Sequence, residues 1–316
     1  MAYGIINEAL YKRRNKMNTK EVVLQARKLG KCIPAFNCPH VPMVKPICEA
    51  IRDENSVAMI QVARVEWEKM SSESLERIAE EYHKYKSEGH TLLHLDHIPA
   101  VDEDFKNVDY MDLLNRAFKV GFQSVMIDGS RLSLEDNIAV TKEAALAAHA
   151  AGVPIEAELG AVMGHEAGEM PPYEEIFAKK MGFTKLDEAK KFAAESTCDW
   201  LSVACGNLHG RVAEAVRNQK KPEARLDVDH IADLYAAAGI PLVLHGGSGI
   251  NHECVLAAIK SGIAKINVGT EIRQTYEFAL EEKPGDIAFA QQKVYERTRD
   301  YIKNYLYNTD LADQIK

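Results

Sequence analysis

Short apolar runs alternate with longer helical patterns along most of the chain, and this alternation constrains the fold more than any other feature. Eight apolar or β-branched runs are predicted to be strands, at residues 32–36, 56–62, 91–95, 124–127, 154–159, 200–204, 241–244 and 264–268. Helical patterns lie between them at residues 41–53, 72–86, 109–120, 134–151, 186–196, 228–238 and 253–261. Strands that alternate with helices pair in parallel through helical crossovers. Eight such units in about 250 residues favour a closed α/β fold, a (β/α)8 TIM barrel, over an open doubly wound sheet.

The two ends of the chain are predicted to add helices to this barrel. Asn18 and Glu21 have the spacing of a capping box, which predicts an extra helix before the first strand. Residues from about 283 to 316 are expected to form a C-terminal helical tail, a candidate for contacts in a homo-oligomer, either a dimer or a tetramer. The whole chain, residues 1–316, is interpreted as a single TIM-barrel domain.

The composition is that of a globular protein with an ample core, since 46% of the 316 residues are hydrophobic and 27% are charged. The net charge is −8 and no long block of Lys or Arg occurs, so nucleic acid is not an expected partner. No apolar run has the length of a membrane span or a signal peptide, so no membrane partner is expected either. The six cysteines are scattered without paired spacing, which is typical of reduced thiols and of a cytoplasmic location.

Three histidines, His97, His209 and His245, each lie where a predicted strand gives way to a loop rich in Gly, Pro or acidic residues. A barrel collects such strand ends at one face, where its chemistry occurs. Three imidazoles there form an open zinc site, with the fourth position left to substrate or water. A lone histidine at a strand end is more often a hydrogen-bonded core residue, but three in the same context favour the metal site.

Acidic residues flank this predicted metal site. Asp96 directly precedes His97 and is a candidate proton carrier, although a carboxylate there can also orient a ligand or belong to an ordinary turn. Glu156 and Glu158 share one face of their strand. Paired inward carboxylates are costly to bury without a cation, so we expect a cation nearby, unless both lie exposed at the barrel rim.

Two loops are predicted to bind phosphate, because TIM barrels place phosphate sites after strands seven and eight. The first loop, residues 246–249, has the sequence Gly-Gly-Ser-Gly, and the second is Gly269-Thr270 at the start of a helix. Glycines let backbone N–H groups converge on an anion, and a helix N-terminus adds its dipole. Tight turns that need a positive φ are the simpler alternative for either loop alone.

Two further segments, residues 98–107 and 160–185, are longer than a barrel requires, which is typical of loops that close over a ligand. Arg64 and Arg131 follow strand ends. They are candidates for recognising a second anionic group, and surface arginines are the equally good alternative.

Seven blocks of the sequence together resemble the class II, metal-dependent ketose-bisphosphate aldolases, of the fructose- or tagatose-bisphosphate aldolase type. The resemblance runs from about Asn18 to the end of the barrel. The blocks are Pro-Ala-Phe-Asn at 34–37, His-Leu-Asp-His at 94–97, Val-Met-Ile-Asp-Gly-Ser at 125–130, Ile-Glu-Ala-Glu-Leu-Gly at 155–160 with Gly164 and Glu166, Leu-His-Gly at 208–210, His-Gly-Gly-Ser-Gly at 245–249, and Asn267 with Thr270-Glu271.

The resemblance implies the roles of the site residues. It implies zinc held by His97, His209 and His245, with Asp96 donating a proton to the aldehyde-derived hydroxyl during condensation. Glu166 is implied to exchange the proton on the nucleophilic carbon. The resemblance also implies a second or alternative divalent metal position at Asp128 and Glu158, and a monovalent cation near the phosphate loops. The implied binding site for dihydroxyacetone phosphate is formed by Gly210, Gly246, Ser248, Gly269 and Thr270. Asn37 and Asn267 are implied to be polar positions around that site.

The implied activity is a lyase reaction, the reversible aldol cleavage of a phosphorylated ketose to dihydroxyacetone phosphate and an aldehyde. Two alternatives stay open: a metal-assisted sugar-phosphate isomerase or epimerase, and a phosphosugar-binding protein without turnover. Three residues, Ala63, Ile98 and Gly269, depart from the family pattern. The part of the site that selects the aldehyde is therefore undetermined. A bisphosphate, a monophosphate or a sulfonated sugar phosphate therefore all fit the sequence.

Overall fold

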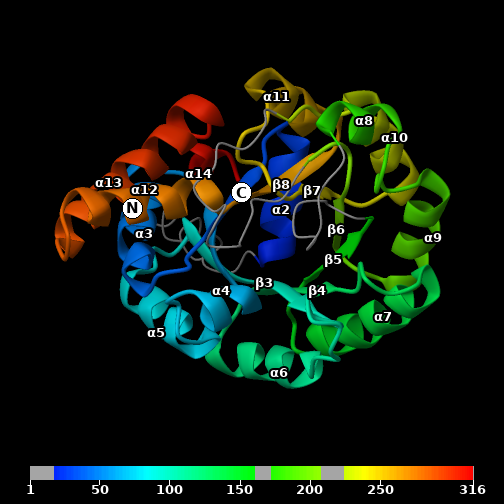
Figure 1. The fold of residues 1–316 in the computed structure, drawn as a ribbon, viewed down its shortest axis with the longest axis horizontal. Coiled ribbons are helices and arrows are strands. Elements are labelled where there is room, and N and C mark those ends of the chain that lie inside the picture. Colours follow the sequence, from blue (N-terminus) through cyan, green and yellow to red (C-terminus); the bar gives the residue numbers. More distant parts are fainter. Residues whose placement is uncertain (1–17, 161–171, 208–223, 316) are drawn as a thin grey trace, which may run out of the picture.

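Eight parallel strands close into a barrel in the computed structural model, which describes residues 18–160, 172–207 and 224–315. Each strand pairs with its neighbours in sequence, and β8 pairs with β1 (Figure 1). The strands are β1 (Ile33–Asn37), β2 (Ala58–Ala63), β3 (Thr91–Pro99), β4 (Ser124–Asp128), β5 (Ile155–Leu159), β6 (Trp200–Val203), β7 (Leu242–Leu244) and β8 (Ile263–Val268). The predicted (β/α)8 barrel and all eight of its strands are confirmed.

Helices surround the strands, as Figure 1 shows. They are α2 (Thr19–Lys28), α3 (Val44–Asp53), α4 (Arg64–Lys69), α5 (Leu75–Tyr85), α6 (Tyr110–Val120), α7 (Leu134–Ala150), α8 (Tyr173–Ala178), α9 (Leu186–Ser196), α10 (Val228–Ala238), α11 (His252–Ser261), α12 (Thr270–Glu282), α13 (Ile287–Asp300) and α14 (Leu311–Gln314), with a 3-10 turn at Val41–Met43 and a π-helical turn at Tyr301–Tyr305. The capping box at Asn18 is present, since its side chain accepts from the Glu21 N–H at 2.9 Å.

The helices differ from the predicted ones in three places. Residues 72–74 precede α5, because the Ser74 hydroxyl accepts from the Arg77 N–H and so caps the helix. The predicted helix 41–53 begins as the 3-10 turn Val41–Met43 before α3. The short helices α4 and α8 lie in connections that the sequence pattern leaves unassigned.

The barrel interior is apolar at one end and polar at the other. Val57, just before β2, and Met59 of β2 are followed by Gln61 on the same face, and Val243 of β7 is followed by His245. The apolar inward residues form a buried cluster with α2 and α14, so these helices cover the N-terminal end of the barrel. Polar inward residues lie from the middle of the barrel to its C-terminal end, where parallel barrels hold their sites.

A β-bulge interrupts β3 where the site residues occur. Leu95 pairs with Val125 and Ile98 pairs with Ile127, so three steps along β3 match two steps along β4. His97 adopts the left-handed region with φ +34°. A regular strand points adjacent side chains to opposite faces, whereas the extra residue lets Asp96 and His97 both face the interior. The predicted strand ended at Leu95; the structure corrects this, because pairing resumes beyond the bulge and continues to Pro99.

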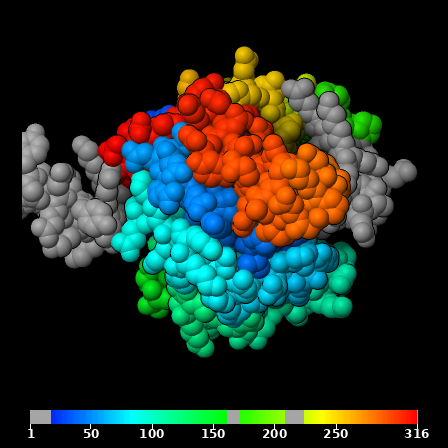
Figure 2. Space-filling view, turned by 90° about the vertical axis from the view of Figure 1, so that its left-hand side faces the viewer, coloured from blue at the N-terminus to red at the C-terminus, as the bar shows by residue number. Residues whose placement is uncertain are grey.

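The C-terminal helices pack beside the first helices of the barrel. α13 lies against α3, and Figure 2 shows the orange and red C-terminal segment beside the blue one. Arg299 of α13 forms an ion pair with the buried Glu54 at 2.6 Å, and the Asn308 amide donates to the Cys32 carbonyl at 2.7 Å. The predicted C-terminal tail is thus a helical segment fastened to the barrel. Among the described residues, no helix has the length and apolar character needed to cross a bilayer.

We expect Gly129→Ala to destabilise the fold, since a Cβ there would lie 2.2 Å from Oδ1 of Asn137. Asn137 is buried in α7 and donates to the Glu158 carbonyl at 3.0 Å, so it has little room to move. Overpacking of this kind costs about 1–3 kcal/mol. Urea denaturation measures the change. In an Asn137→Ala background the added methyl has space, so an equal cost of Gly129→Ala in both backgrounds would contradict the steric explanation.

Candidate active site

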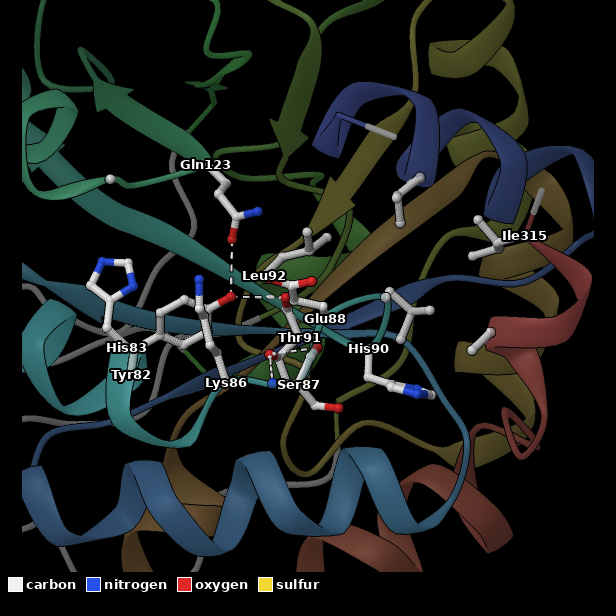
Figure 3. A pocket seen from close by; sticks show the side chains of 15 residues that line it. Tyr82, His83, Lys86, Ser87, Glu88, His90, Thr91, Leu92, Gln123 and Ile315 are labelled. Carbon is white, nitrogen blue, oxygen red and sulfur yellow. Dashed lines mark hydrogen bonds between the residues drawn. The ribbon is translucent and has the colours of Figure 1, made fainter. Parts of the chain in front are cut away.

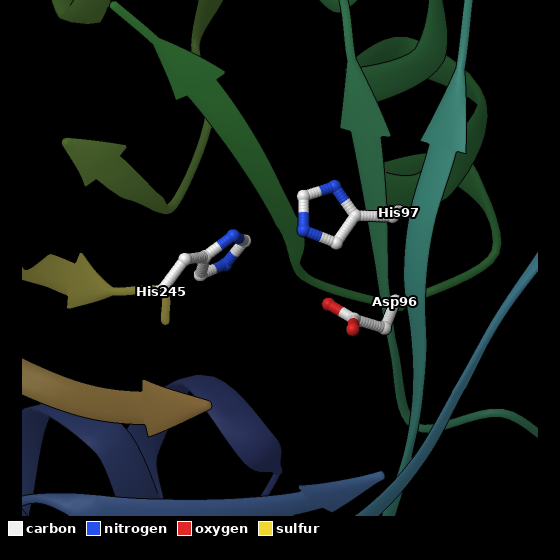
Figure 4. A group of neighbouring side chains, drawn as sticks. All are labelled: Asp96, His97 and His245. Atoms are coloured by element: carbon white, nitrogen blue, oxygen red, sulfur yellow. The ribbon is translucent and has the colours of Figure 1, made fainter. Parts of the chain in front are cut away.

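Asp96, His97 and His245 converge at the C-terminal end of the barrel, from β3 and from the residue that follows β7 (Figure 4). One ligand atom from each lies within 4.8 Å of the others. The two imidazole rings meet edge to face, with their centroids 4.6 Å apart. The structure therefore brings two of the three predicted metal ligands together beside the predicted proton carrier. The third predicted ligand, His209, lies outside the described residues, as do Gly210 and Glu166.

Three amide hydrogens hold the Asp96 carboxylate. Oδ2 accepts from Asn37 Nδ2 at 3.0 Å and from Gln61 Nε2 at 3.2 Å, and Oδ1 accepts from Asn267 Nδ2 at 3.0 Å. Burial raises the pKa of Asp96, but the charges of His97, Lys265 and His245 outweigh it and hold the pKa below its usual range. The predicted polar positions Asn37 and Asn267 thus contact the candidate proton carrier directly.

His97 faces two further carboxylates, from β4 and β5. Its Nδ1 lies 3.2 Å from Asp128 Oδ2 and 3.9 Å from Glu158 Oε2. Burial lowers the pKa of His97, but the Asp96 charge and the Asp128 and Glu158 carboxylates outweigh it and raise the pKa to about 10. Such a carboxylate-rich group matches the donors that bind a divalent cation, and His97, Asp128 and Glu158 form a second convergent set of possible ligands.

His245 is fully buried between two glutamates of β5. Nε2 lies 2.8 Å from Glu156 Oε1, and Nδ1 lies 3.1 Å from Glu158 Oε2. A carboxylate can only accept, so each glutamate favours a proton on the nitrogen that it faces. A divalent ion held by His245 and Glu158 would replace the proton on Nδ1, while Glu156 supports Nε2, as is usual for metal-binding histidines. The donor set therefore fits a divalent ion.

The cation expected beside Glu156 is Lys265, which the sequence analysis did not identify. Both residues are fully buried, with Lys265 Nζ 2.9 Å from Glu156 Oε2. Trp200 Nε1 donates to the same carboxylate at 2.7 Å. The sequence could have indicated this residue, because a lysine within the apolar run of β8, two residues before Asn267, must share the inward face with Asn267. Glu156 is thus a buried, paired carboxylate, and the alternative of exposure at the rim is wrong.

The predicted phosphate loops lie after β7 and β8. Gly246 has φ +63°, a region that favours glycine, and a Cβ on Gly247 would lie 2.8 Å from Ile266 Cδ1. Ser248 belongs to the same loop. Thr270 is the first residue of α12, whose N-cap is Gly269. A Cβ on Gly269 would lie 3.3 Å from Asn37 Oδ1, so this helix begins beside the residues that hold Asp96.

The two candidate arginines differ in their surroundings. Arg64 binds Glu68 at 2.7 Å and lies 3.7 Å from Asp102, so carboxylates already neutralise it. Arg131 is exposed and donates to the Val101 carbonyl at 3.3 Å. Both thus fasten the segment at residues 98–107, in which the Asp102 carboxylate accepts from the Lys106 N–H.

A separate cavity of about 280 Å³ lies at the opposite end of β3 (Figure 3). It is lined by Tyr82, His83, Lys86, Thr91 and Gln123 among others. The Tyr82 hydroxyl contacts the Thr91 carbonyl at 2.8 Å and Gln123 Oε1 at 3.0 Å. This cavity lies far from the convergent carboxylates and imidazoles, so we do not assign the chemistry to it.

Glu66 of α4 is a second site residue that the sequence analysis missed. Its Oε2 accepts from the Ala63 N–H at 2.9 Å, and its side chain is buried. Burial outweighs this hydrogen bond and, with the nearby Asp96 charge, raises the pKa of Glu66 to about 8. Because α4 itself was not predicted, no pattern placed Glu66 here.

We expect Glu66→Gln to become more stabilising as pH rises. The pKa of Glu66 rises from about 4.3 in the unfolded chain to about 8 on folding. Between these values the folded state binds more protons, so this contribution to stability is present below about pH 4 and is lost as pH approaches 8. Urea denaturation at pH 5.5, 7 and 8.5 measures the difference. The exposed Glu195→Gln serves as the control, and a pH-independent difference for Glu66→Gln would contradict the assignment.

The family profile described as "Fructose-bisphosphate aldolase class-II" matches residues 17–310. The fructose-bisphosphate aldolase of Streptococcus pneumoniae serotype 4 is 31% identical over 291 residues, which cover 89% of each chain. The sulfofructosephosphate aldolase of Alkalicoccus urumqiensis is 32% identical over 263 residues, 83% of each chain. Among solved structures, the YdjI aldolase from Escherichia coli K12 gives a TM-score of 0.72 at 26% identity, covering 93% of this chain and 98% of that chain. The chain therefore belongs to the class II fructose-bisphosphate aldolase family.

Proposed function

We propose that this lyase cleaves a phosphorylated ketose reversibly to dihydroxyacetone phosphate and an aldehyde. The observation that carries the proposal is the convergence of Asp96, His97 and His245. An aldol cleavage needs a group that takes a proton from the substrate hydroxyl and a site that stabilises the resulting enediolate. A buried, ionised carboxylate beside two imidazoles meets both needs.

Zinc is the proposed metal, held by His97, His209 and His245. When bound, it would polarise the ketose carbonyl and the adjacent hydroxyl and so stabilise the enediolate. Asp128 and Glu158 are proposed to provide a second or alternative position for a divalent ion. A monovalent cation near the phosphate loops completes the proposed set of cofactors.

Asp96 is proposed to move the proton on the aldehyde-derived hydroxyl. In cleavage the carboxylate accepts this proton, and in condensation it returns it. The amides of Asn37, Gln61 and Asn267 hold the Asp96 carboxylate in place. The charges of His97, Lys265 and His245 keep it ionised. Glu166 is proposed to exchange the proton on the nucleophilic carbon.

The phosphate of the ketose is proposed to bind at the loops after β6, β7 and β8. Backbone N–H groups and hydroxyls at the N-terminus of α12 suit an anion. The proposed residues are Gly210, Gly246, Ser248, Gly269 and Thr270, with Asn37 and Asn267 beside the carbon chain. A cytoplasmic homo-oligomer, dimer or tetramer, is the proposed form, which sedimentation would test.

The experiment that tests this function is a coupled assay for dihydroxyacetone phosphate. It uses fructose and tagatose 1,6-bisphosphates, a ketose monophosphate and a sulfonated ketose phosphate, each with zinc and after chelation. Two of the relatives are named a fructose-bisphosphate aldolase and a sulfofructosephosphate aldolase, so the set includes a bisphosphate and a sulfonated sugar. We expect release from one sugar that is lost on chelation and restored by zinc. Isomerised sugar without cleavage would favour the isomerase alternative, and zinc binding without turnover would favour the binding protein.

We expect Asp96→Asn to lower kcat by about 10²- to 10⁴-fold, because an amide cannot accept the hydroxyl proton. Zinc stoichiometry should stay the same, since the three proposed histidine ligands remain. Steady-state kinetics and metal analysis on the same sample check both parts. Full activity in this variant would exclude Asp96 as the proton carrier.

A further inference from the structure

Lys265 lies inside the barrel rather than at the rim where the chemistry is proposed. Its side chain is fully buried, and it comes from the middle of β8, where Lys265 pairs with Ile33 of β1 and Val243 of β7. A lysine is almost never fully buried unless it is paired. Its position two residues before Asn267 places both side chains on the same face of the strand.

The ammonium contacts two groups that lead in different directions. Nζ donates to Asn267 Oδ1 at 2.6 Å and forms the ion pair with Glu156 Oε2 at 2.9 Å. Asn267 continues to Asp96, and Glu156 continues to His245. A continuous line of hydrogen bonds thus joins the proposed proton carrier to a proposed metal ligand, with Lys265 at its centre.

The contact with Asn267 fixes the direction of that amide. An ammonium has only donors, so it selects the amide oxygen and turns the NH2 group toward Asp96. The reversed amide would point its oxygen at the Asp96 carboxylate and its NH2 at the ammonium, and both contacts would be repulsive. Lys265 therefore determines which atom of Asn267 meets Asp96.

The contact with Glu156 acts in the same way on His245. Glu156 Oε2 accepts hydrogen bonds from Trp200 Nε1 and Lys265 Nζ, and Glu156 Oε1 accepts one from His245 Nε2. Lys265 and Trp200 thus fix the orientation of the Glu156 carboxylate, whose other oxygen faces His245 Nε2 at 2.8 Å and so orients the imidazole.

We propose that Lys265 is a positioning residue that orients Asp96 through Asn267 and His245 through Glu156, and so couples the proton carrier to the metal ligand. The proposal rests on the proposed function and adds to it a residue that touches neither substrate nor metal. One residue, Asn267 on one side and Glu156 on the other, separates Lys265 from Asp96 and from His245, yet Lys265 sets the geometry of both.

The first test is Lys265→Met, which keeps the length of the side chain and removes the charge. At saturating zinc we expect kcat to fall by about 10- to 100-fold with KM changed by less than about threefold, as for other residues that orient a ligand. The double variant Lys265→Met/Asn267→Ala should lose less kcat than the two single losses multiplied together, because both substitutions act on the same amide. Losses that multiply would overturn the Asn267 route.

The second test needs no substrate. The zinc dissociation constant, measured by chelator competition, should weaken by about 10- to 100-fold in Lys265→Met, since Glu156 then loses the partner that keeps it aligned with His245. If wild type releases no dihydroxyacetone phosphate, the proposed function fails, whereas this comparison still decides the role of Lys265. Unchanged zinc affinity together with unchanged kcat would overturn the proposal.

Controls separate positioning from stability. Arg299→Met removes the cation beside another buried carboxylate, Glu54, far from the site, and should lower the melting temperature while kcat and zinc affinity stay unchanged. If Lys265→Met does not fold, Lys265→Met/Glu156→Gln removes the leftover buried charge and should still lose kcat through the freed Asn267 amide. Wild-type kcat in that double variant would contradict the proposal.

Discussion

The ion pair between Glu156 and Lys265 is the interaction on which the polar half of the barrel depends. Either charge alone, inside a closed barrel, would cost several kcal/mol. Together, and with Trp200 and His245 bound to the same carboxylate, they satisfy each other and allow the amides and imidazoles above them to be buried as well. The apolar end of the barrel then supplies the stability that a polar interior cannot.

The fold followed from the sequence because its signals are local and repeated. Each strand is a short apolar run, and each is followed by a helical pattern, so small errors at the ends do not change the architecture. The strand-end rule of parallel barrels also predicted that Asp96, His97 and His245 would meet, although they are distant in sequence. Residues 161–171 and 208–223, which carry Glu166 and His209, lie outside the described structure, so their roles stay predictions.

The features that could not be predicted from the sequence depend on strand register and on contacts between distant segments. No periodic pattern marks the bulge in β3, because it is a mismatch between two strands. Lys265 could be recognised only by asking which face of β8 points inward, and Glu66 only by knowing that α4 exists. Arg64 shows the same limit, since its carboxylate partners come from α4 and from the segment after β3.

The bulge in β3 makes the chemistry depend on the number of residues as well as on their identity. A strand that pairs regularly offers every second side chain to the interior, so no substitution can place two neighbours there. The pair Asp96 and His97 exists because one strand is a residue longer than its partner over the same stretch. Deleting one residue between Leu95 and Ile98 would repair the pairing and remove one of the two groups. This site is therefore sensitive to insertions and deletions as well as to replacements, and a barrel with a regular third strand would have to draw the same two groups from separate strands.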